Sequence, residues 1–221
     1  MLVTPSGDFK IFSWYPNDMQ AQFRRLRAPW TYMTPAEKKQ GPFQRPKRWF
    51  PAKEYKRRKV QKVFGLTTSN GKSLCFPVTK PYHSIEWAAD MKLHVAPFLK
   101  ETFPRLQSYK ILLDGEPLFY TAVAKKAMTE CNISVLPNWP KYSPDLNPQE
   151  NVWGWAEKKL RVLELPNDTF EEFQPKILEA VGEYPGSAKL VGSMAKRCQS
   201  VFLEKESKTT SYPSLSYMVD V

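Results

Sequence analysis

The hydrophobic pattern of the chain first predicts a set of strands. Residues 9–15 (FKIFSWY) alternate between apolar and polar positions, as a half-buried strand does, and a Pro-Ser-Gly-Asp turn is expected to precede them. Two β-rich runs flank Asn70-Gly71, a pair that favours a two-residue hairpin loop. Residues 109–114 (YKILLD) form a short apolar run, which predicts a buried strand with Asp114 at its C-terminal tip.

Segments with helical spacing separate these strands. Residues 83–103 carry apolar residues at helical spacing, including Ile85 and Ala89, and we expect a break near Pro97. The other predicted elements are a helix over 121–132, a strand over 133–140 and helices over 168–184 and 187–206. Because strands and helices alternate, we expect an α/β fold with a mixed central sheet flanked by helices.

A further helix is predicted to begin within the stretch YSPDLNPQENVW, residues 142–153. Asn147 suits the N-cap and Pro148 suits the first helical position, where its missing N–H is not needed. Glu150 is then the third residue of the helix, near the positive end of the helix dipole. It either folds back onto the Asn147 amide as a capping box or stays available for chemistry, and local pattern leaves both open.

Composition limits the function classes. The 221 residues carry a net charge of +11, which fits a polyanionic partner, most often nucleic acid. No apolar run is long enough to span a membrane, and the start has no signal-peptide pattern. Three widely separated cysteines are typical of reduced thiols. We therefore expect a nuclear or cytoplasmic protein that is not secreted and does not bind a membrane.

The positive charge is concentrated in a proline-rich stretch, residues 16–62, that we expect to be an extended loop or insertion. Within it, basic residues interleave with aromatic ones, so that phosphate contacts and base stacking are both available. Packing of the aromatic residues into the core is the alternative. The candidate nucleic-acid-binding residues are Lys47, Arg48, Trp49, Lys53, Lys56, Arg57, Arg58 and Lys59, together with Lys158 and Lys159 on the helix after Asn147.

Two carboxylates stand where an α/β sheet usually binds ligands. Asp114 lies at a strand tip, and the chain then returns to deliver Glu150 on the first turn of the next helix. Converging carboxylates favour a hard cation such as Mg²⁺ or Mn²⁺. With a third carboxylate they would hold two ions, the arrangement of two-metal phosphodiester cleavage.

The stretch from Asp114 to Leu160 resembles the catalytic block of Tc/mariner-type DDE transposases. Residues 139–153 (WPKYSPDLNPQENVW) keep every fixed position of the family motif Trp-Pro-x-x-Ser-Pro-Asp-Leu-Asn-Pro-x-Glu-Asn-x-Trp. The hairpin around Phe64-Gly65 and the closing stretch 192–212 are also similar. The resemblance implies an RNase H-like fold, covering residues 1–212 with a tail over 213–221. It also implies a divalent-metal DDE endonuclease that cuts and joins DNA, acting as a dimer on DNA.

Carried over to this sequence, the resemblance implies that Asp8, Asp114 and Glu150 are the catalytic and metal-binding residues. At Asp8 a turn formed by Pro-Ser-Gly-Asp is the alternative interpretation. The chain also departs from the family pattern. Phe9 replaces a Glu, Gly115-Glu116 replaces Asn-Ala, and Phe119 stands where a His is usual. Glu116 either adds charge beside the site or faces solvent.

Three functions follow from these expectations. The first is a metal-dependent enzyme that cleaves a DNA phosphodiester and transfers the strand. The second is a non-catalytic DNA-binding or scaffold protein derived from a transposase, which the expected lack of an N-terminal helix-turn-helix region favours. The third is a fragment of a longer transposase.

Overall fold

The computed structural model describes residues 4–14, 58–79, 81–137, 139, 146–163, 169–194 and 196–199. Most of the proline-rich stretch 16–62, residues 200–212 and the tail 213–221 lie outside the described residues. Strand β2 (Lys59–Thr67) nevertheless begins at Lys59, so the last four residues of that stretch are strand and not loop.

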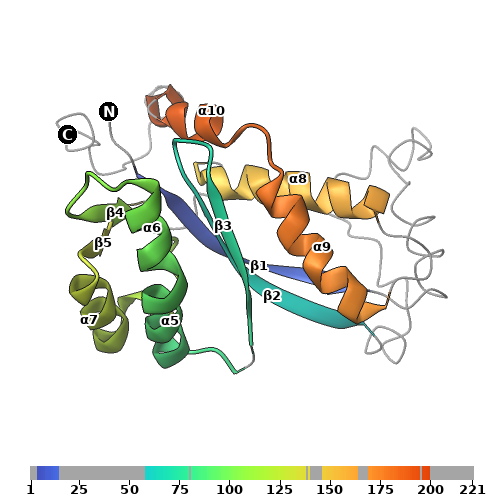
Figure 1. Cartoon of the computed structure of the whole chain (residues 1–221), viewed down its shortest axis with the longest axis horizontal. Coiled ribbons are helices and arrows are strands. Elements are labelled where there is room, and N and C mark those ends of the chain that lie inside the picture. Colours follow the sequence, from blue (N-terminus) through green and yellow to red (C-terminus); the bar gives the residue numbers. More distant parts are fainter. Residues whose placement is uncertain are drawn as a thin grey trace, which may run out of the picture.

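Five strands form the centre of the described structure (Figure 1). Strand β1 (Ser6–Trp14) pairs with β2, and β2 pairs with β3 (Ser73–Val78), both antiparallel. Strand β4 (Tyr109–Ile111) runs parallel to β5 (Ile133–Val135). A parallel bridge from Ser6 to Leu112 joins the two sets, so the strand order is β3-β2-β1-β4-β5. The predicted mixed sheet is confirmed.

Strand β1 begins earlier than the sequence pattern predicts. Ser6, Gly7 and Asp8 pair with β2, opposite Thr67, Leu66 and Gly65 in turn, so the expected Pro-Ser-Gly-Asp turn is wrong. Gly7 suits this position because a Cβ there would meet Phe64 at 2.7 Å. Gly7 therefore marks a crowded position within the sheet, where a side chain would not fit, and not a turn.

The hairpin between β2 and β3 is confirmed, but its loop is not the two-residue type. The amide of Gly71 donates to the carbonyl of Thr68 at 3.3 Å, and the amide of Thr68 donates to Lys72 at 3.1 Å. Gly71 has a φ of +90°. These features describe a three-residue loop in which the positive φ falls only on Gly71.

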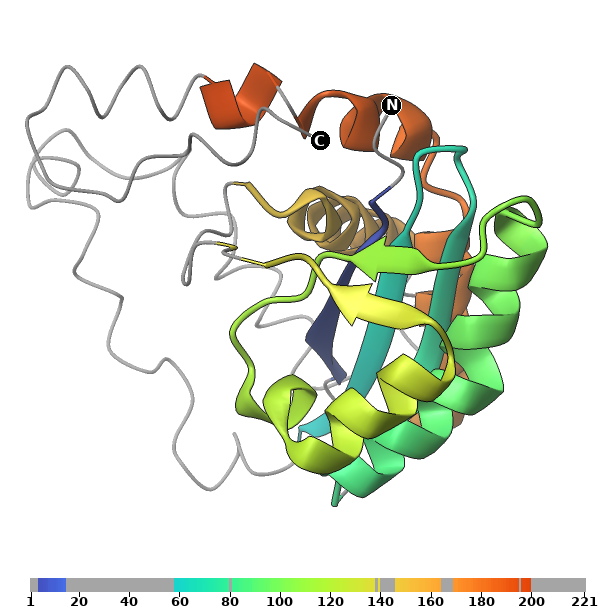
Figure 2. The same cartoon turned by 90° about the vertical axis from the view of Figure 1, so that its left-hand side faces the viewer.

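Helices α5 (Ser84–Asp90), α6 (Ala96–Thr102) and α7 (Ala122–Glu130) lie on one side of the sheet (Figures 1 and 2). A π-helical turn, η1 (Met91–Val95), joins α5 to α6, so Pro97 widens the helix just before it rather than ending it. Trp87, Met91, Val95 and Leu99 pack against Phe64, Leu66 and Phe76 of the sheet. Ile85 and Ala89, expected inside, are exposed, because Trp87 and Met91 set the buried face.

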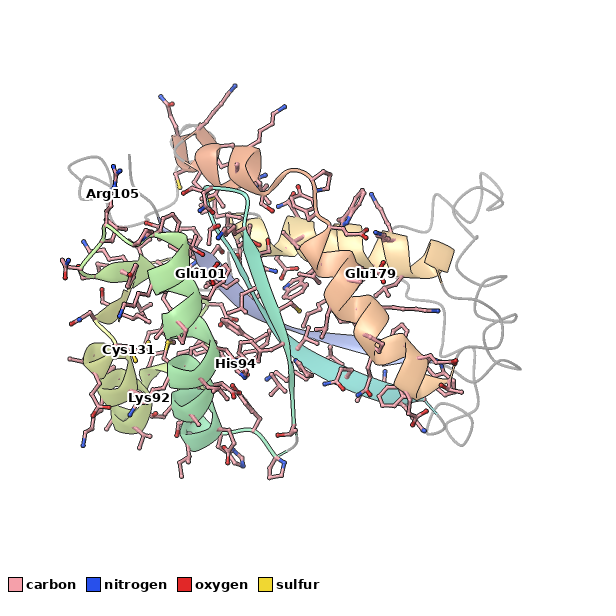
Figure 3. The ribbon with its side chains drawn as sticks, in the orientation of Figure 1. Lys92, His94, Glu101, Arg105, Cys131 and Glu179 are labelled. Atoms are coloured by element: carbon pink, nitrogen blue, oxygen red, sulfur yellow. The ribbon has the colours of Figure 1, made fainter. Side chains whose placement is uncertain are left out.

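An ion pair ties these helices together at their surface. Lys92 of η1 lies 2.6 Å from the carboxylate of Glu130 at the end of α7. Figure 3 shows Lys92, His94, Glu101 and Cys131 on this side of the sheet, whereas Glu179 lies on the opposite side.

The opposite face is covered by α8 (Pro148–Leu163) and α9 (Phe170–Gly182), with α10 (Ser187–Gly192) beyond them. Helix α8 has an apolar face formed by Val152, Trp153, Ala156 and Leu160, which are all buried in one cluster with Phe12, Val63 and residues of α9. The side chain of Thr169 caps α9 in a capping box with Glu172. Within the described part of the chain, no helix is long and apolar enough to cross a membrane.

Candidate active site

Asp8 lies in β1, and Asp114 lies shortly after β4, where the chain runs parallel to the start of β1. The amide of Gly7 donates to the carbonyl of Leu112 at 2.9 Å, and the amide of Leu112 donates to Pro5 at 2.8 Å. Asp8 lies two residues beyond the Ser6–Leu112 bridge in β1, and Asp114 lies two residues beyond it in the segment that follows β4. Strand pairing therefore brings the two aspartates to the same level of the sheet, although 105 residues lie between them.

Glu150 is brought to this point by the start of α8. The side-chain oxygen of Asn147 accepts a hydrogen bond from the amide of Gln149 at 3.0 Å, which confirms Asn147 as the N-cap. Among the hydrogen bonds of the described residues, none joins the Glu150 carboxylate to the Asn147 amide, so the capping-box interpretation is wrong. The cap is supplied by Asn147 itself, which leaves the carboxylate of Glu150 available.

Polar contacts fix α8 on the sheet at the level of Asp8. The Asn147 side chain accepts from Ser6 Oγ at 2.6 Å and donates to Asp8 Oδ2 at 3.2 Å. Gln149, fully buried, accepts from Thr67 Oγ1 at 2.7 Å. Ser6 and Asp8 lie on β1 and Thr67 lies on β2, so the start of the helix is held by both strands.

A glycine in β2 allows this close approach. Gly65 is paired with Asp8 in the sheet, and a Cβ at Gly65 would meet Trp153 at 2.3 Å and Gln149 at 2.7 Å. The Phe64-Gly65 pair of the hairpin motif thus has a geometric reason. Phe64 fills the core on one face, and Gly65 leaves room for α8 on the other.

The electrostatics of the site converge on Asp8. The pKa of its carboxyl is raised from 3.8 to about 7. Burial is the largest cause, the charges of Asp114, Glu150 and Glu116 add to it, and a hydrogen bond from the Phe9 amide opposes the shift. The carboxylate of Asp8 is therefore repelled by the carboxylates of both Asp114 and Glu150. Such mutual repulsion is relieved by a proton or by a cation.

A short loop after β4 shapes the surroundings of Asp114. Its carboxylate accepts from the Glu116 amide at 3.1 Å, and its carbonyl accepts from the hydroxyl of Tyr120 at 3.0 Å. Glu116 does not simply face solvent. It forms an ion pair with Lys62 at 3.2 Å, and that ammonium lies 4.0 Å above the ring of Phe9. The charge that Glu116 adds beside the site is thus partly compensated.

Two departures from the family motif contact each other. The rings of Phe9 and Phe119 are stacked, with centroids 5.3 Å apart and an interplanar angle of 5°. Phe119 belongs to the 3₁₀ helix η2 (Pro117–Tyr120) and is fully buried. The aromatic pair therefore connects β1, directly after Asp8, with the loop that follows Asp114.

The donor chemistry of the site suits a hard divalent cation, since it consists of carboxylate oxygens from three elements. The described residues contain no three His, Cys, Asp or Glu side chains close enough to enclose a metal ion. Both oxygens of Asp8 are instead hydrogen-bonded, to the Phe9 amide and to Asn147. Binding of a cation would have to draw the carboxylates closer together.

The candidate nucleic-acid-binding residues divide into two groups. Lys47, Arg48, Trp49, Lys53, Lys56 and Arg57 lie outside the described residues. Of the others, Lys59 pairs with Glu171 at 3.7 Å and Lys159 pairs with Glu183, so both charges are compensated within the protein. Lys158 is exposed and Arg58 is partly exposed.

Several residues that build the site were not singled out from the sequence. Ser6, Thr67 and Gln149 are buried polar residues whose hydrogen bonds span more than 80 positions of the chain. A lone Ser, Thr or Gln carries no local signal of such a role. Gly65 did carry one, because an isolated glycine inside a strand pattern indicates close approach of another element.

Comparison with known proteins identifies the family. The sequence model of the DDE superfamily endonucleases matches residues 34–173, a range that includes Asp114 and Glu150 but not Asp8. None of the curated proteins matches the chain.

Among solved structures, the Mos1 transposase catalytic domain with raltegravir and Mg is 13% identical and has a TM-score of 0.59, covering 89% of this chain and 80% of that one. A pre-cleavage Mos1 transpososome is 15% identical with a TM-score of 0.60, covering 95% of this chain and 57% of that one. These likenesses establish the RNase H-like fold. Because the family match extends over more than half of its residues, the chain belongs to the DDE superfamily endonucleases.

Proposed function

We propose that this protein is a divalent-metal-dependent DNA endonuclease of the DDE type, which cleaves a phosphodiester bond and transfers the strand. The observation that carries the proposal is the arrangement of three carboxylates. Asp8 and Asp114 each lie two residues beyond the parallel Ser6–Leu112 bridge, and the charges of Asp114 and of Glu150, at the start of α8, both contribute to the raised pKa of Asp8. An assembly of acids that repel one another is costly for a structural role and is typical of a functional site.

In this proposal Asp8, Asp114 and Glu150 hold Mg²⁺ or Mn²⁺. Mos1 structures have been solved with Mg and with Mn, which supports the choice of metal. The bound ions would polarise the phosphate, activate the attacking hydroxyl and stabilise the leaving oxygen. The residues of the chain supply the framework. Asn147 and Gln149 fix the helix start, and Tyr120 and the Glu116 amide fix Asp114.

The proposed substrate is DNA, bound chiefly through its phosphates. The net charge of +11 favours a polyanion, and Mos1 structures include paired-end and strand-transfer complexes. We propose that this chain likewise acts on DNA ends, as a homodimer.

Metal binding is tested by the melting temperature with and without Mn²⁺. At a Mn²⁺ concentration near 100 times its dissociation constant, the wild-type protein should gain roughly 2.7 kcal/mol of stability, or about 5–10 °C. Asp114→Ala should abolish this gain. Glu179→Gln, which removes an exposed carboxylate on α9, is the matched control and should keep it (Figure 3).

Catalysis is tested by cleavage of supercoiled plasmid and of oligonucleotide duplexes in Mn²⁺. Asp8→Asn, Asp114→Asn and Glu150→Gln should each lower the cleavage rate by more than about 100-fold, whereas Glu179→Gln should not. A wild-type protein that binds DNA but never cleaves it in Mg²⁺ or Mn²⁺ would contradict the proposal.

A further inference from the structure

Asn147 makes hydrogen bonds to three separate parts of the site. Its side-chain oxygen accepts from Ser6 Oγ at 2.6 Å and from the Gln149 amide at 3.0 Å. Its side-chain nitrogen donates to Asp8 Oδ2 at 3.2 Å. All of the residues involved are buried, so these bonds are shielded from competition with water.

The orientation of this amide group is determined by its partners. Ser6 Oγ and the Gln149 amide are both donors facing the same atom, so that atom must be the oxygen. The nitrogen is then directed at Asp8, which as a carboxylate offers only acceptors. An N-cap alone would need only an oxygen, which Ser and Asp supply equally well. The donor directed at Asp8 is therefore a feature that helix capping does not explain.

We propose that Asn147 is a positioning residue, which locks the carboxylate of Asp8 to the start of α8 and so sets its position relative to Glu150. Glu150 lies three residues further along the same helix turn, and its amide donates to the Asn147 carbonyl at 3.2 Å. Asn147 thus contacts Asp8 through its side chain and the backbone of Glu150 through its carbonyl. The expected effect of Asn147 on metal binding rests on the proposed metal-dependent function. The hydrogen bond from Asn147 to Asp8 does not.

The bond itself is tested by thermal unfolding without metal at pH 8. Asn147→Asp keeps the cap and replaces the donor with a carboxylate that faces Asp8, so it should lower the melting temperature by about 5 °C. In an Asp8→Asn background the same change should cost little, because the reversed pair can form the hydrogen bond again. The Asp114→Asn background is the matched control, since it removes a nearby charge that does not contact Asn147. The cost of Asn147→Asp should persist there.

The positioning role of Asn147 is tested by measuring Mn²⁺ affinity with electron paramagnetic resonance. Asn147→Ser keeps a good N-cap and removes the side-chain amide nitrogen that donates to Asp8, so its melting temperature should stay within about 3 °C of wild type. Its affinity for Mn²⁺ should nevertheless fall by about 10- to 100-fold, as for other residues that orient metal ligands. Thr169→Ser, a cap change on α9 remote from the site, should leave the Mn²⁺ affinity unchanged.

The two measurements separate the possible failures. An equal cost of Asn147→Asp in the wild-type and Asp8→Asn backgrounds would overturn the proposed link. Unchanged Mn²⁺ affinity in Asn147→Ser would overturn the positioning role. If the wild-type protein binds no Mn²⁺ at all, the metal-dependent function fails, and the unfolding measurements still decide whether Asn147 locks Asp8.

Discussion

At the scale of single residues, the site is defined by one buried acid. Asp8 is largely buried, accepts hydrogen bonds from the Phe9 amide and from Asn147, and is repelled by Asp114 and Glu150. Its raised pKa makes the free energy of unfolding depend on pH. The folded protein keeps the proton up to about pH 7, whereas the unfolded chain releases it near pH 3.8. The native state is therefore destabilised as pH rises from about 4 to about 7.

Asp8→Asn should remove this loss of stability. Above pH 7 the variant should be more stable than the wild-type protein by on the order of 2 kcal/mol, less than the full shift because one hydrogen bond is weakened. At pH 4 the two proteins should differ little. Melting temperatures measured from pH 4 to pH 8 in metal-free buffer check this, and parallel curves for the two proteins would contradict it.

At the scale of secondary-structure elements, the site depends on how closely α8 approaches β2. Gly65 lies beneath Trp153 and Gln149, so the helix can rest directly on the strand beside Asp8. Ser6 and Thr67 then hold the first turn of the helix by buried hydrogen bonds. The position of α8 on the sheet therefore sets the position of Glu150 relative to Asp8.

Gly65→Ala should test this contact. Its Cβ would overlap the ring of Trp153, and the resulting overpacking should cost about 1–3 kcal/mol of unfolding free energy. Gly154→Ala is the matched control. It lies in α8, one residue after Trp153, with nothing within 4 Å of the added Cβ, and should stabilise the protein by about 0.5–1 kcal/mol. Urea unfolding of both variants checks the difference, and equal midpoints would refute the contact.

At the scale of the whole molecule, the charge of +11 should govern the affinity for DNA. Not every cation contributes equally, because some are paired within the protein. Lys158 and Lys159 are sequence neighbours on α8. The first is exposed, whereas the second forms an ion pair with Glu183 after α9. They offer a direct comparison of an exposed charge with a compensated one.

Lys158→Gln should weaken binding to duplex DNA at low salt and reduce the slope of log affinity against log salt concentration by about 0.9. Lys159→Gln should have a smaller effect, because its charge is already balanced by Glu183. Fluorescence anisotropy over a series of salt concentrations measures both slopes. Equal reductions in the two variants would show that the ion pair does not matter for DNA binding.

The sequence by itself determined the local features of this protein. The N-cap at Asn147, the apolar face of α8 and the hairpin at Gly71 follow from side-chain chemistry and backbone preferences within a few residues. The fixed positions of residues 139–153 were also sufficient to suggest the family. Asp114 and Glu150 were proposed on this basis, since each lies at the end of an element whose boundaries the pattern reveals.

Only the tertiary structure decided whether Asp8 lies with the other two acids. The residues Pro-Ser-Gly-Asp favour a turn locally, but pairing with β2 and with the chain at Leu112 makes Ser6, Gly7 and Asp8 the start of a strand. The same holds for the link from Asn147 to Asp8, which joins residues 139 positions apart. Hydrogen bonds of this kind form only after distant elements have packed. Their energies are set by burial and mutual geometry, and no periodicity or short motif in the sequence records either.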